Sequence, residues 1–327
     1  MKKVLVIALV ALVALTSVFA QGAAESSAEK TFSFKLAENQ PENNPVTQGM
    51  RKFAELVEQK TNGTVKIDVY ADALLGSENE TIDMIQAGTL DFARVNTSAL
   101  AATVDDVGVF TLPYVFTSTE HKYKVLDGAV GDAVNKKMED FNMINLAYLE
   151  AGSRNFYTTK KAIKSVADCK GLKIRVQNSA VAIKMVELLG AAATPMDYGE
   201  VYQALQNGVI DAAENDFVSY YTSGHYEVAK MFSLDGHMAP PAVLLVSMTT
   251  WNQLSDSQKK AVQEAATEAA TWQRKAMSDY QNESRAAVEK AGCVIYDVDG
   301  KEFQNAVSAI YDMYPQYAEY IKQIKSI

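Results

Sequence analysis

The sequence is poor in cysteine and histidine, the residues that build disulfide frameworks and most metal centres. Its 327 residues contain two cysteines, Cys169 and Cys293, and three histidines, His121, His225 and His237. The histidines lack metal-binding spacing, and the cysteines form no CxxC pair. One pair of cysteines so far apart is weak evidence for a disulfide, and we expect two packed free thiols. We predict no metal site and no cofactor.

The common catalytic motifs are also absent. The chain contains no HExxH, GxSxG, GxGxxG or P-loop pattern, the signatures of zinc proteases, α/β-hydrolases, dinucleotide-binding enzymes and nucleoside triphosphatases. Glu214 and Asp216 remain as a conceivable general acid and base. We expect a protein that is not an enzyme.

Positive charge is in the minority. Lysine and arginine number 31 against 40 aspartates and glutamates, which gives a formal net charge of −9. This balance argues against nucleic acid or an anionic membrane surface as the main partner. An anion could bind only at a local pocket of positive charge.

Long apolar runs occur only at the N-terminus. Met1 to Ala20 begins with Lys2 and Lys3, continues with apolar residues and ends at a small-residue cleavage site, as secretory signal peptides do. The alternative, a membrane anchor, needs about 20 apolar residues. We expect a cleavable signal peptide over residues 1–20, a flexible tether over 21–30, export to the periplasm and no direct membrane insertion.

The rest of the chain has the composition of a soluble globular protein, with 48% apolar and 22% charged residues. Its length suits about two domains of ~150 residues. The N-terminal part alternates predicted strands with helices, among them a helix from Glu78 to Ala87 that begins with a capping box. A short strand from Asp91 to Val95 follows and carries Arg94 and Asn96 to its carboxyl end.

The stretch from Asp168 to Asp216 predicts the same alternation in a second lobe. A strand around Arg175 is followed by a helix, a strand from Ala192 to Met196, a second helix and a strand from Val209 to Ala213. This is the plan of a doubly wound α/β fold, in which ligands bind beyond the carboxyl ends of the strands. Arg175 falls at such an end.

Three features connect the two predicted lobes. The turn-rich segment from Ala151 to Asn155 is the predicted hinge. An apolar strand from Pro241 to Met248 is expected to run back into the first lobe. Helical periodicity from Asp256 to Lys290 predicts a helix of about 50 Å, longer than one small domain, which we expect to lie across both lobes.

Arginine is rare and unevenly placed. Only six of the basic residues are arginines, and Arg94, Arg154 and Arg175 lie at predicted strand ends or turns. A guanidinium group can bind a carboxylate through two parallel hydrogen bonds, which lysine cannot do. These three residues suggest a pocket for an organic anion, although three salt bridges to nearby acidic residues would account for them equally well.

Amide and carboxylate side chains lie at the same predicted strand ends, where they could bind the hydroxyl groups of a sugar or polyol. They are Asn39, Gln40, Asn96, Gln177, Asn215 and Asp216. Tyr198 could line the same site, although a single tyrosine is more often a core or surface residue.

Two runs of sequence carry a family resemblance. They are KGLKIRVQ (170–177) and TPMDYGEVYQALQNGVIDAAEN (194–215). Together with FAELVEQKTNGTVKIDVY and LPYVF, they resemble the DctP-family solute-binding proteins of tripartite ATP-independent periplasmic (TRAP) transporters. The likeness extends over most of the chain. It implies a two-lobed periplasmic-binding-protein fold, each lobe a sheet flanked by helices, which closes over one ligand.

The resemblance implies roles for four residues. The family's arginine in the GLKIR segment binds the ligand carboxylate and corresponds to Arg175. A second family arginine, after the hinge turn, corresponds to Arg154. The asparagine of the EN pair is Asn215, and the aromatic residue after TPM is Tyr198.

The segment DFARVNTSAL (91–100) resembles a subgroup that binds hexuronates such as D-glucuronate and D-galacturonate, which would add contacts from Arg94 and Asn96. Related proteins often have histidine at Gln40 and proline at Asp216, so the carry-over is weaker there. A C4-dicarboxylate, an aldonate or a sialic acid stays open as the ligand, as does a receptor that feeds a sensor kinase.

The resemblance also implies a domain organisation and partners. Lobe I is expected over residues 31–151 and 240–279, and lobe II over 152–239 and 280–327. The expected partners are an organic anion, a sugar acid, and the membrane subunits of a TRAP transporter. We expect a monomer that uses no ATP and no cofactor.

Overall fold

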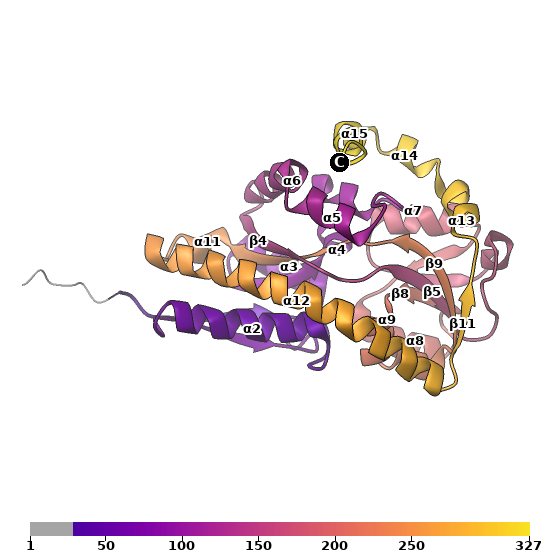
Figure 1. Ribbon diagram of the computed structural model, residues 1–327, viewed down its shortest axis with the longest axis horizontal. Helices are drawn as coiled ribbons and strands as arrows, with labels where there is room; N and C mark the ends of the chain where they lie inside the picture. The colour runs from indigo at the N-terminus through magenta and orange to yellow at the C-terminus, as the bar shows by residue number, and fades with distance from the viewer. Residues whose placement is uncertain (1–28) are drawn as a thin grey trace, which may run out of the picture. The chain divides into compact units, whose positions relative to one another are not determined.

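The computed structural model describes residues 29–327, so the predicted signal peptide and residues 21–28 of the predicted tether lie outside the described residues. Residues 32–327 form two β-sheets flanked by helices (Figure 1). The predicted α/β fold class is therefore confirmed.

The first sheet combines N-terminal strands with one strand from much later in the chain. Its strands are β1 (Phe32–Ala37), β2 (Val65–Tyr70), β3 (Phe92–Asn96), β4 (Met143–Leu149) and β10 (Ala242–Ser247). Their order is β2-β1-β3-β10-β4, with β1, β2 and β3 parallel and β10 antiparallel to both neighbours. The predicted return of the chain into the first lobe is confirmed.

The second sheet contains six strands in the order β11-β9-β5-β8-β6-β7. They are β5 (Arg154–Thr158), β6 (Lys173–Val176), β7 (Ala192–Pro195), β8 (Ala212–Asn215), β9 (Met231–Met238) and β11 (Val294–Asp297). β6 is parallel to β7 and β8, whereas β5 is antiparallel to β8 and β9. The sheet is therefore mixed, and only part of it has the predicted parallel plan.

One predicted strand of this sheet begins later than expected. The apolar pattern predicts a strand from Val209 to Ala213, but β8 begins at Ala212. Gly208 has a φ of 69°, and the amide of Val209 donates to the carbonyl oxygen of Ala204. This helix-terminating turn leaves Val209 55% exposed, because its backbone is used in the turn before the strand can start.

Two helices have the predicted bounds because their N-terminal caps are strong. α3 (Glu78–Ala87) and α12 (Asp256–Lys290) both begin with a capping box. In this motif the side chains of the N-cap residue and of the third helical residue each accept a hydrogen bond from the other residue's backbone amide. The other helices are α2 (Pro45–Lys60), α4 (Thr97–Leu100), η1 (Asp105–Thr111), α5 (Thr119–Leu126), α6 (Ala129–Glu139), η2 (Val166–Cys169), α7 (Ala180–Leu188), η3 (Tyr198–Glu200), α8 (Val201–Gln206), α9 (Phe217–Thr222), α10 (His225–Val228), α11 (Met248–Trp251), α13 (Gly300–Val307), α14 (Ile310–Met313), η4 (Pro315–Tyr317) and α15 (Ala318–Ile324).

The long helix α12 connects the two halves of the fold. It packs against α2 and β4 beside the first sheet and against α9 beside the second (Figure 1). Small residues such as Ala265 and Ala269 form its buried face. The approach to α2 is close, since a Cβ added to Gly49 would lie 2.7 Å from Cγ of Gln273. The predicted position of this helix across both lobes is confirmed.

Two extended crossings, residues 150–153 and 239–241, connect the sheets. The first was predicted as a hinge over residues 151–155, but β5 begins at Arg154, so the last two of these residues belong to the second sheet. Gly152 has a φ of 79°, and an added Cβ would lie 2.3 Å from Cβ of Asp216. Only glycine fits this turn without displacing its neighbour.

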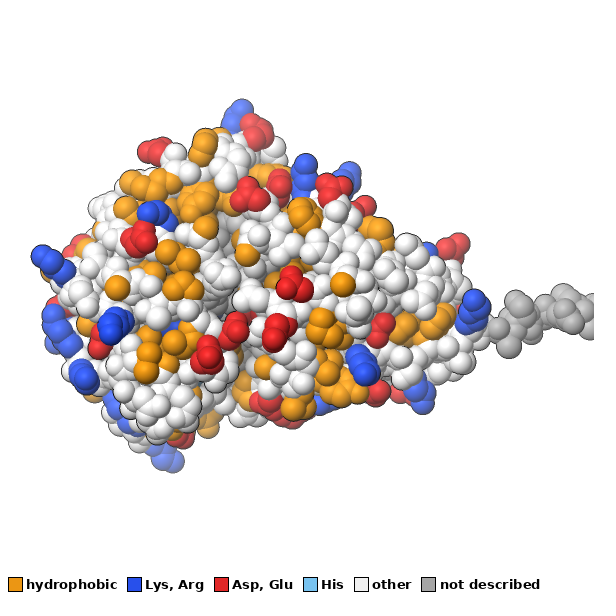
Figure 2. Space-filling view, turned by 180° about the vertical axis from the view of Figure 1, so that it is seen from behind, with side chains coloured by type: hydrophobic (Ala, Val, Ile, Leu, Met, Phe, Trp, Pro, Cys, Tyr) orange, Lys and Arg blue, Asp and Glu red, His pale blue; other side chains and the backbone are white. Residues whose placement is uncertain are grey.

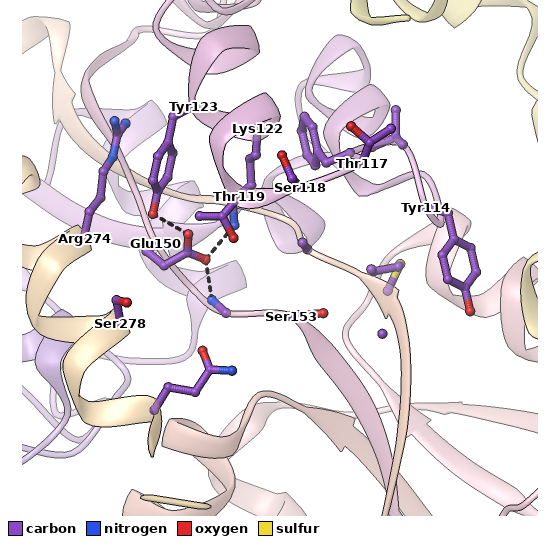
Figure 3. A pocket seen from close by; sticks show the side chains of 17 residues that line it. Tyr114, Thr117, Ser118, Thr119, Lys122, Tyr123, Glu150, Ser153, Arg274 and Ser278 are labelled. Atoms are coloured by element: carbon purple, nitrogen blue, oxygen red, sulfur yellow. Dashed lines mark hydrogen bonds and ion pairs between the residues drawn. The ribbon is translucent and has the colours of Figure 1, made fainter. Parts of the chain in front are cut away.

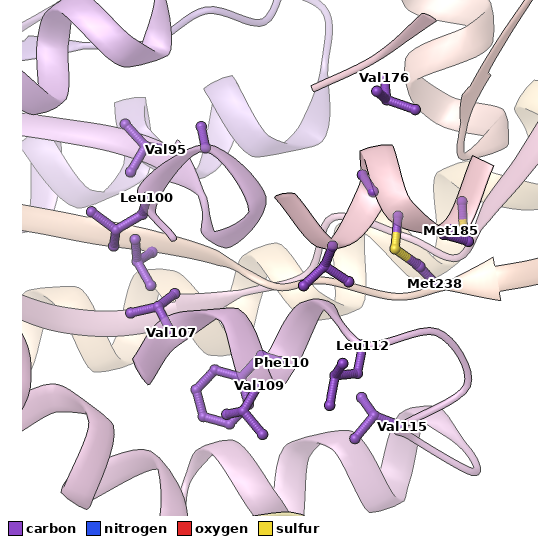
Figure 4. Close-up of a cluster of buried hydrophobic side chains, with 14 of the residues drawn as sticks. Val95, Leu100, Val107, Val109, Phe110, Leu112, Val115, Val176, Met185 and Met238 are labelled. Carbon is purple, nitrogen blue, oxygen red and sulfur yellow. The ribbon is translucent and has the colours of Figure 1, made fainter. Parts of the chain in front are cut away.

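One buried hydrophobic cluster includes side chains from both sheets. Val107, Val109 and Phe110 of η1 belong to the same cluster as Val95 of β3 and Met185 of α7 (Figure 4). The C-terminal segment joins the same cluster at Ile310 and Tyr317. The lobes therefore share an apolar contact, and the exact division of the chain between them stays a prediction.

Cys169 and Cys293 are buried free thiols, which confirms the prediction of packed cysteines. In the described part of the chain, every helix is too short or too polar to cross a membrane. On the face shown in Figure 2, acidic side chains gather across the middle, and basic side chains lie mostly toward the edges.

Candidate functional site

A polar cavity lies between the two sheets at the carboxyl ends of β3, β6 and β8. About 20 Å³ of it is accessible to the centre of a water molecule, and the space between its walls, open solvent included, is about 390 Å³. Its lining includes nine of the ten predicted site residues: Arg175, Arg154, Asn215, Arg94, Asn96, Gln177, Tyr198, Asn39 and Gln40. The position agrees with the general rule that ligands bind beyond the carboxyl ends of parallel strands.

Arg175 is the lining arginine that keeps donors for a ligand. It is 2% exposed, and its Nε and Nη2 donate to the carbonyl oxygen of Met196 at 3.0 and 2.7 Å. Within residues 29–327, no carboxylate pairs with its guanidinium group, and Nη1 has no hydrogen-bond partner. Its guanidinium carbon lies 5.7 Å from the ring centre of Tyr198. Backbone and ring thus fix the group, and the carboxylates that act on its charge, Glu214 and Glu78, do so without a direct hydrogen bond to it.

Arg154 lines the cavity, but four of its five N–H donors already have partners. Its Nε and Nη2 bind the carboxylate of Glu214, Nη2 also donates to the Glu214 carbonyl oxygen, and Nη1 donates to Oδ1 of Asn215 at 3.0 Å. Burial raises the pKa of Glu214, but Arg154 and His237 outweigh it and lower the pKa to about 2. For Arg154 the structure therefore supports the salt-bridge alternative, and it orients Asn215 toward the cavity.

His237 extends this buried ionic network. Its Nδ1 lies 2.7 Å from Oδ2 of Asp235, its Nε2 lies 3.5 Å from Oε2 of Glu214, and its ring stacks on Phe156. Burial lowers the pKa of His237, but Asp235 and Glu214 outweigh this effect and raise the pKa to about 9. The imidazole is therefore held as a cation between two carboxylates.

This raised pKa predicts a pH-dependent stability. The unfolded histidine has a pKa of about 6.5, so the stabilisation is complete below that pH and is lost as the pH rises through about 9. We expect the free energy of unfolding to fall by about 3 kcal/mol over this range, since one pKa unit is about 1.4 kcal/mol. Urea unfolding of the protein and of His237→Gln, measured from pH 6 to 10, checks it. Parallel curves for the two proteins would contradict the assignment.

Arg94 is also paired with carboxylates. It is 3% exposed, binds both oxygens of Glu38 and the Oδ1 of Asn39, and its Nη1 donates to Oε1 of Glu78 at 3.3 Å. The guanidinium group of Arg94 is thus bound by side chains of the first lobe. A direct contact of Arg94 with a ligand stays a prediction, and the pairing shows that it orients two buried glutamates.

Glu78 was missed by the sequence reasoning. It lines the cavity at 8% exposure, accepts from the amide of Asn96 at 2.8 Å through Oε1 and from Nε2 of Gln177 at 3.0 Å through Oε2. Burial raises its pKa, and the amide of Asn96 and the charge of Arg175 oppose that rise. Its position at the first turn of α3 was a usable signal, because that turn faces the carboxyl end of the neighbouring strands.

The other predicted polar residues have local partners as well. The side chain of Asn96 caps α4, with Oδ1 accepting from the amide of Ser98 at 2.9 Å. Gln40 accepts from Nδ2 of Asn44 at 3.2 Å. The hydroxyl of Tyr198 lies 2.7 Å from that of Ser223. These hydrogen bonds hold the lining side chains in place, so the cavity is largely pre-formed.

Asp216 is the one predicted site residue that the structure does not bring to the cavity. It caps α9, and its carboxylate accepts from the amides of Val218 and Ser219. Burial raises its pKa to about 6 although these donors oppose the rise. A short acidic side chain after a strand is as suited to capping the next helix as to binding a ligand, and here it caps.

Hydrogen bonds cross the cavity from one lobe to the other. Besides the bond from Gln177 to Glu78, Nδ2 of Asn79 donates to Oδ1 of Asp197 at 3.3 Å, and Nδ2 of Asn44 donates to Oγ1 of Thr222 at 3.1 Å. The lobes are therefore closed on each other in this structure.

A wider cavity lies at the hinge, where it holds about 1040 Å³ of empty space, open solvent included. Figure 3 shows Lys122 and Tyr123 of α5, Glu150 of the crossing and Arg274 of α12 on its walls. Its charges are already paired, Lys122 with Glu150 at 2.6 Å and Arg274 with Asp127 at 2.5 Å. An anion would find no free cation here, so the smaller cavity around Arg175 is the better candidate despite its size.

Comparisons with known proteins agree on one family. The model of the family described as bacterial extracellular solute-binding protein, family 7 (DctP) matches residues 36–319. A solute-binding protein of Chromohalobacter salexigens is 38% identical over 83% of this chain and 81% of its own length. The 2,3-diketo-L-gulonate-binding periplasmic protein YiaO of Escherichia coli is 32% identical over 79% of both chains.

Solved structures of similar proteins contain sugar acids. A TRAP periplasmic solute-binding protein of Roseobacter denitrificans with bound β-D-glucuronate is 36% identical, has a TM-score of 0.87 and covers 90% of this chain and 99% of its own. A TRAP periplasmic solute-binding protein of Bradyrhizobium sp. in complex with D-galacturonate is 36% identical and has a TM-score of 0.88. The match covers 90% of this chain and 100% of that protein's chain. One of Polaromonas sp. bound to D-erythronate is 32% identical, with a TM-score of 0.88 over 91% and 99%.

Proposed function

The chain belongs to family 7 of the bacterial extracellular solute-binding proteins, the DctP family, and we propose that it captures a hexuronate, D-glucuronate or D-galacturonate, for a TRAP transporter. The observation that carries the proposal is Arg175, a buried guanidinium group without a carboxylate partner among the described residues. Similar proteins with bound glucuronate and galacturonate support the choice of ligand.

The chemistry of capture follows from the charge of this cavity. A carboxylate that leaves water loses its hydration, and this cost must be offset by a buried partner. The partly free fork of Arg175 supplies that partner, while amides such as Asn39, Gln177 and Asn215 can bind hydroxyl groups. Tyr198 adds an apolar ring face beside the guanidinium group. The ten predicted residues, with Asp216 as the weakest, stay proposals as ligand contacts.

Closure of the lobes is the second part of the proposal. In an open form the two sheets would separate at the crossings, and Arg175 would attract the anion. Ligand contacts made from both lobes favour the closed form. The closed protein then binds the membrane subunits of the transporter, which move the sugar acid inward. The chain itself uses no ATP in this cycle.

The family consists of solute-binding proteins that act in the periplasm, which favours binding over catalysis. We propose that residues 1–20 are a cleaved signal peptide that exports the chain. We further propose that it is a monomer without enzymatic activity, with lobe I over residues 31–151 and 240–279 and lobe II over the remainder of residues 152–327.

An aldonate is the second candidate ligand, because a similar structure contains D-erythronate. A C4-dicarboxylate is also represented, by the C4-dicarboxylate-binding protein DctB of Bacillus subtilis, 28% identical to this chain. These ligands share the carboxylate and differ in their hydroxyl groups, so a direct comparison separates them.

A thermal-shift screen tests the proposed function. A ligand that binds only the folded protein stabilises it by about 2.7 kcal/mol at 100 times its Kd. We expect a shift of several degrees with D-glucuronate or D-galacturonate and little shift with succinate. Shifts with aldonates, succinate or sialic acid alone would replace the uronate by that ligand. No shift with any of these anions would overturn the proposal.

A further inference from the structure

We propose that Glu78 makes this site selective for acids with a single carboxylate and that it rejects aldarates, the dicarboxylic acids of the same sugars. This inference rests on the proposed function, because it assumes that one ligand carboxylate binds Arg175. It goes further by naming Glu78 as the group that contacts the ligand at a distance from that carboxylate and so sets the selectivity.

The first observation is an uneven distribution of charge around the cavity. In the second lobe, Arg175 is a cation without a carboxylate partner within residues 29–327, and Arg154 is neutralised by Glu214. In the first lobe, Glu38 and Glu78 share the single cation Arg94. The cavity therefore has one cationic group on one side and one excess carboxylate on the other.

The second observation is that Glu78 is the glutamate of this pair that lines the cavity. Glu38 does not line the cavity, and its two oxygens are used by Arg94 and by the amide of Gln40 at 2.8 Å. Glu78 lines the cavity and receives three hydrogen bonds, from Arg94, the Asn96 amide and Gln177. A carboxylate has about four acceptor positions, so one position remains for a ligand donor.

These two observations select a class of ligand. A sugar hydroxyl can donate to the free position of Glu78, and a charge-assisted hydrogen bond of this kind is strong. A second ionised carboxylate has no proton to donate and brings a like charge into a buried site. Like charges at short distance in such a site repel strongly. With one carboxylate held on Arg175, Glu78 therefore favours hydroxyl-bearing monoacids and disfavours diacids.

Matched ligand pairs test this selectivity. D-glucuronate and D-glucarate share a six-carbon chain, as do D-galacturonate and galactarate, and the aldarate of each pair carries a second carboxylate at C1. Because the uronates are pyranose rings and the aldarates are open chains, the acyclic pair D-gluconate and D-glucarate, which differs only at C6, is titrated beside them. Calorimetric titration of the wild-type protein should show at least 100-fold tighter binding of the uronate than of the aldarate. Equal affinity for the two acids would overturn the proposal.

Glu78→Gln is the decisive variant. The amide keeps the size and one acceptor oxygen for Asn96, and Gln177 can turn its own amide to suit the new donor. We expect the preference for the uronate to fall at least tenfold, mainly because the aldarate binds more tightly. An unchanged preference in Glu78→Gln would contradict the inference, and the melting temperature without ligand would show that the variant is folded.

Asp83→Asn is the matched control. Asp83 lies on the same helix but is exposed, so the variant removes the same charge without changing the cavity, and the preference should stay at the wild-type value. If no uronate binds the wild-type protein, the proposed function is wrong. The pair D-gluconate and D-glucarate, measured in the same proteins, then decides the role of Glu78 separately.

Discussion

Replacing Arg175 with alanine should weaken binding of the sugar acid by about 3–5 kcal/mol, which is roughly a 10²- to 4 × 10³-fold rise in Kd. The ligand carboxylate would be buried without its cationic partner, because Arg94 and Arg154 are already bound to glutamates. Calorimetric titration with the ligand found by thermal shift gives the value directly. Wild-type affinity in Arg175→Ala would show that the carboxylate binds elsewhere.

Two further variants make this result specific. Arg175→Lys keeps the charge but replaces the planar fork by a point charge, so binding should weaken there as well. Arg51→Ala is the control, because Arg51 pairs with Glu42 on the exposed surface of the first lobe. Its removal should leave Kd unchanged. A similar loss in Arg51→Ala would indicate a general effect of charge on association rather than a contact at the site.

Replacing Lys122 with methionine should lower the free energy of unfolding by about 3–5 kcal/mol, because it leaves a buried carboxylate without its counter-charge. Lys122 is 2% exposed and Glu150 is 6% exposed. The carboxylate of Glu150 also accepts from the hydroxyl of Tyr123 at 2.5 Å and the amide of Gly152 at 2.7 Å (Figure 3). Burial raises the pKa of Glu150, but Lys122 and these donors outweigh it and lower the pKa.

Lys124→Met supplies the matched control on the same helix. Lys124 pairs with Glu120 at 3.0 Å on the surface, and exposed pairs of this kind contribute about 0–1 kcal/mol. Urea unfolding of both variants and the wild-type protein measures the difference. Equal losses in the two variants would contradict the role given to the hinge pair.

The ion pair of Lys122 with Glu150 also holds the crossing between the two sheets in place. The amide and carbonyl of Glu150 both bond to the side chain of Gln273, at 2.9 Å each. The crossing is thus anchored to α12 on one side and to α5 on the other. Loss of Lys122 should loosen the segment on which lobe closure depends.

Much of the fold was predictable because its signals are local. The capping boxes at Ser77 and Ser255 mark the starts of α3 and α12 in the sequence itself. Alternating apolar residues mark β1, and a continuous apolar run marks β10. The start of β8 was not predictable from this pattern, because the turn after Gly208 uses the backbone of Val209 and competes with the strand.

Nine of the ten predicted residues line the cavity, but Glu78 was missed and the roles were not predictable. Arg94, Arg154 and Arg175 look alike in the sequence, since each lies at or near the end of a strand or turn. The structure separates them by their partners: two bind buried glutamates, whereas in the described part of the chain Arg175 donates to a backbone carbonyl oxygen and to no carboxylate. The role of Asp216 was ambiguous in the same way, and in the structure its side chain caps the N-terminus of α9.

By itself, the sequence determined the fold class, the family and most of the polar residues around the cavity, because periodicity, helix caps and motifs are properties of neighbouring residues. Only the tertiary structure decided which charges are compensated. Glu78 lies 16 positions from Arg94 and 99 from Gln177 along the chain, and their pairing exists only once the two lobes are folded and closed. The free charge of Arg175 and the excess charge at Glu78 are therefore properties of the assembled site, since electrostatic compensation depends on distance in space.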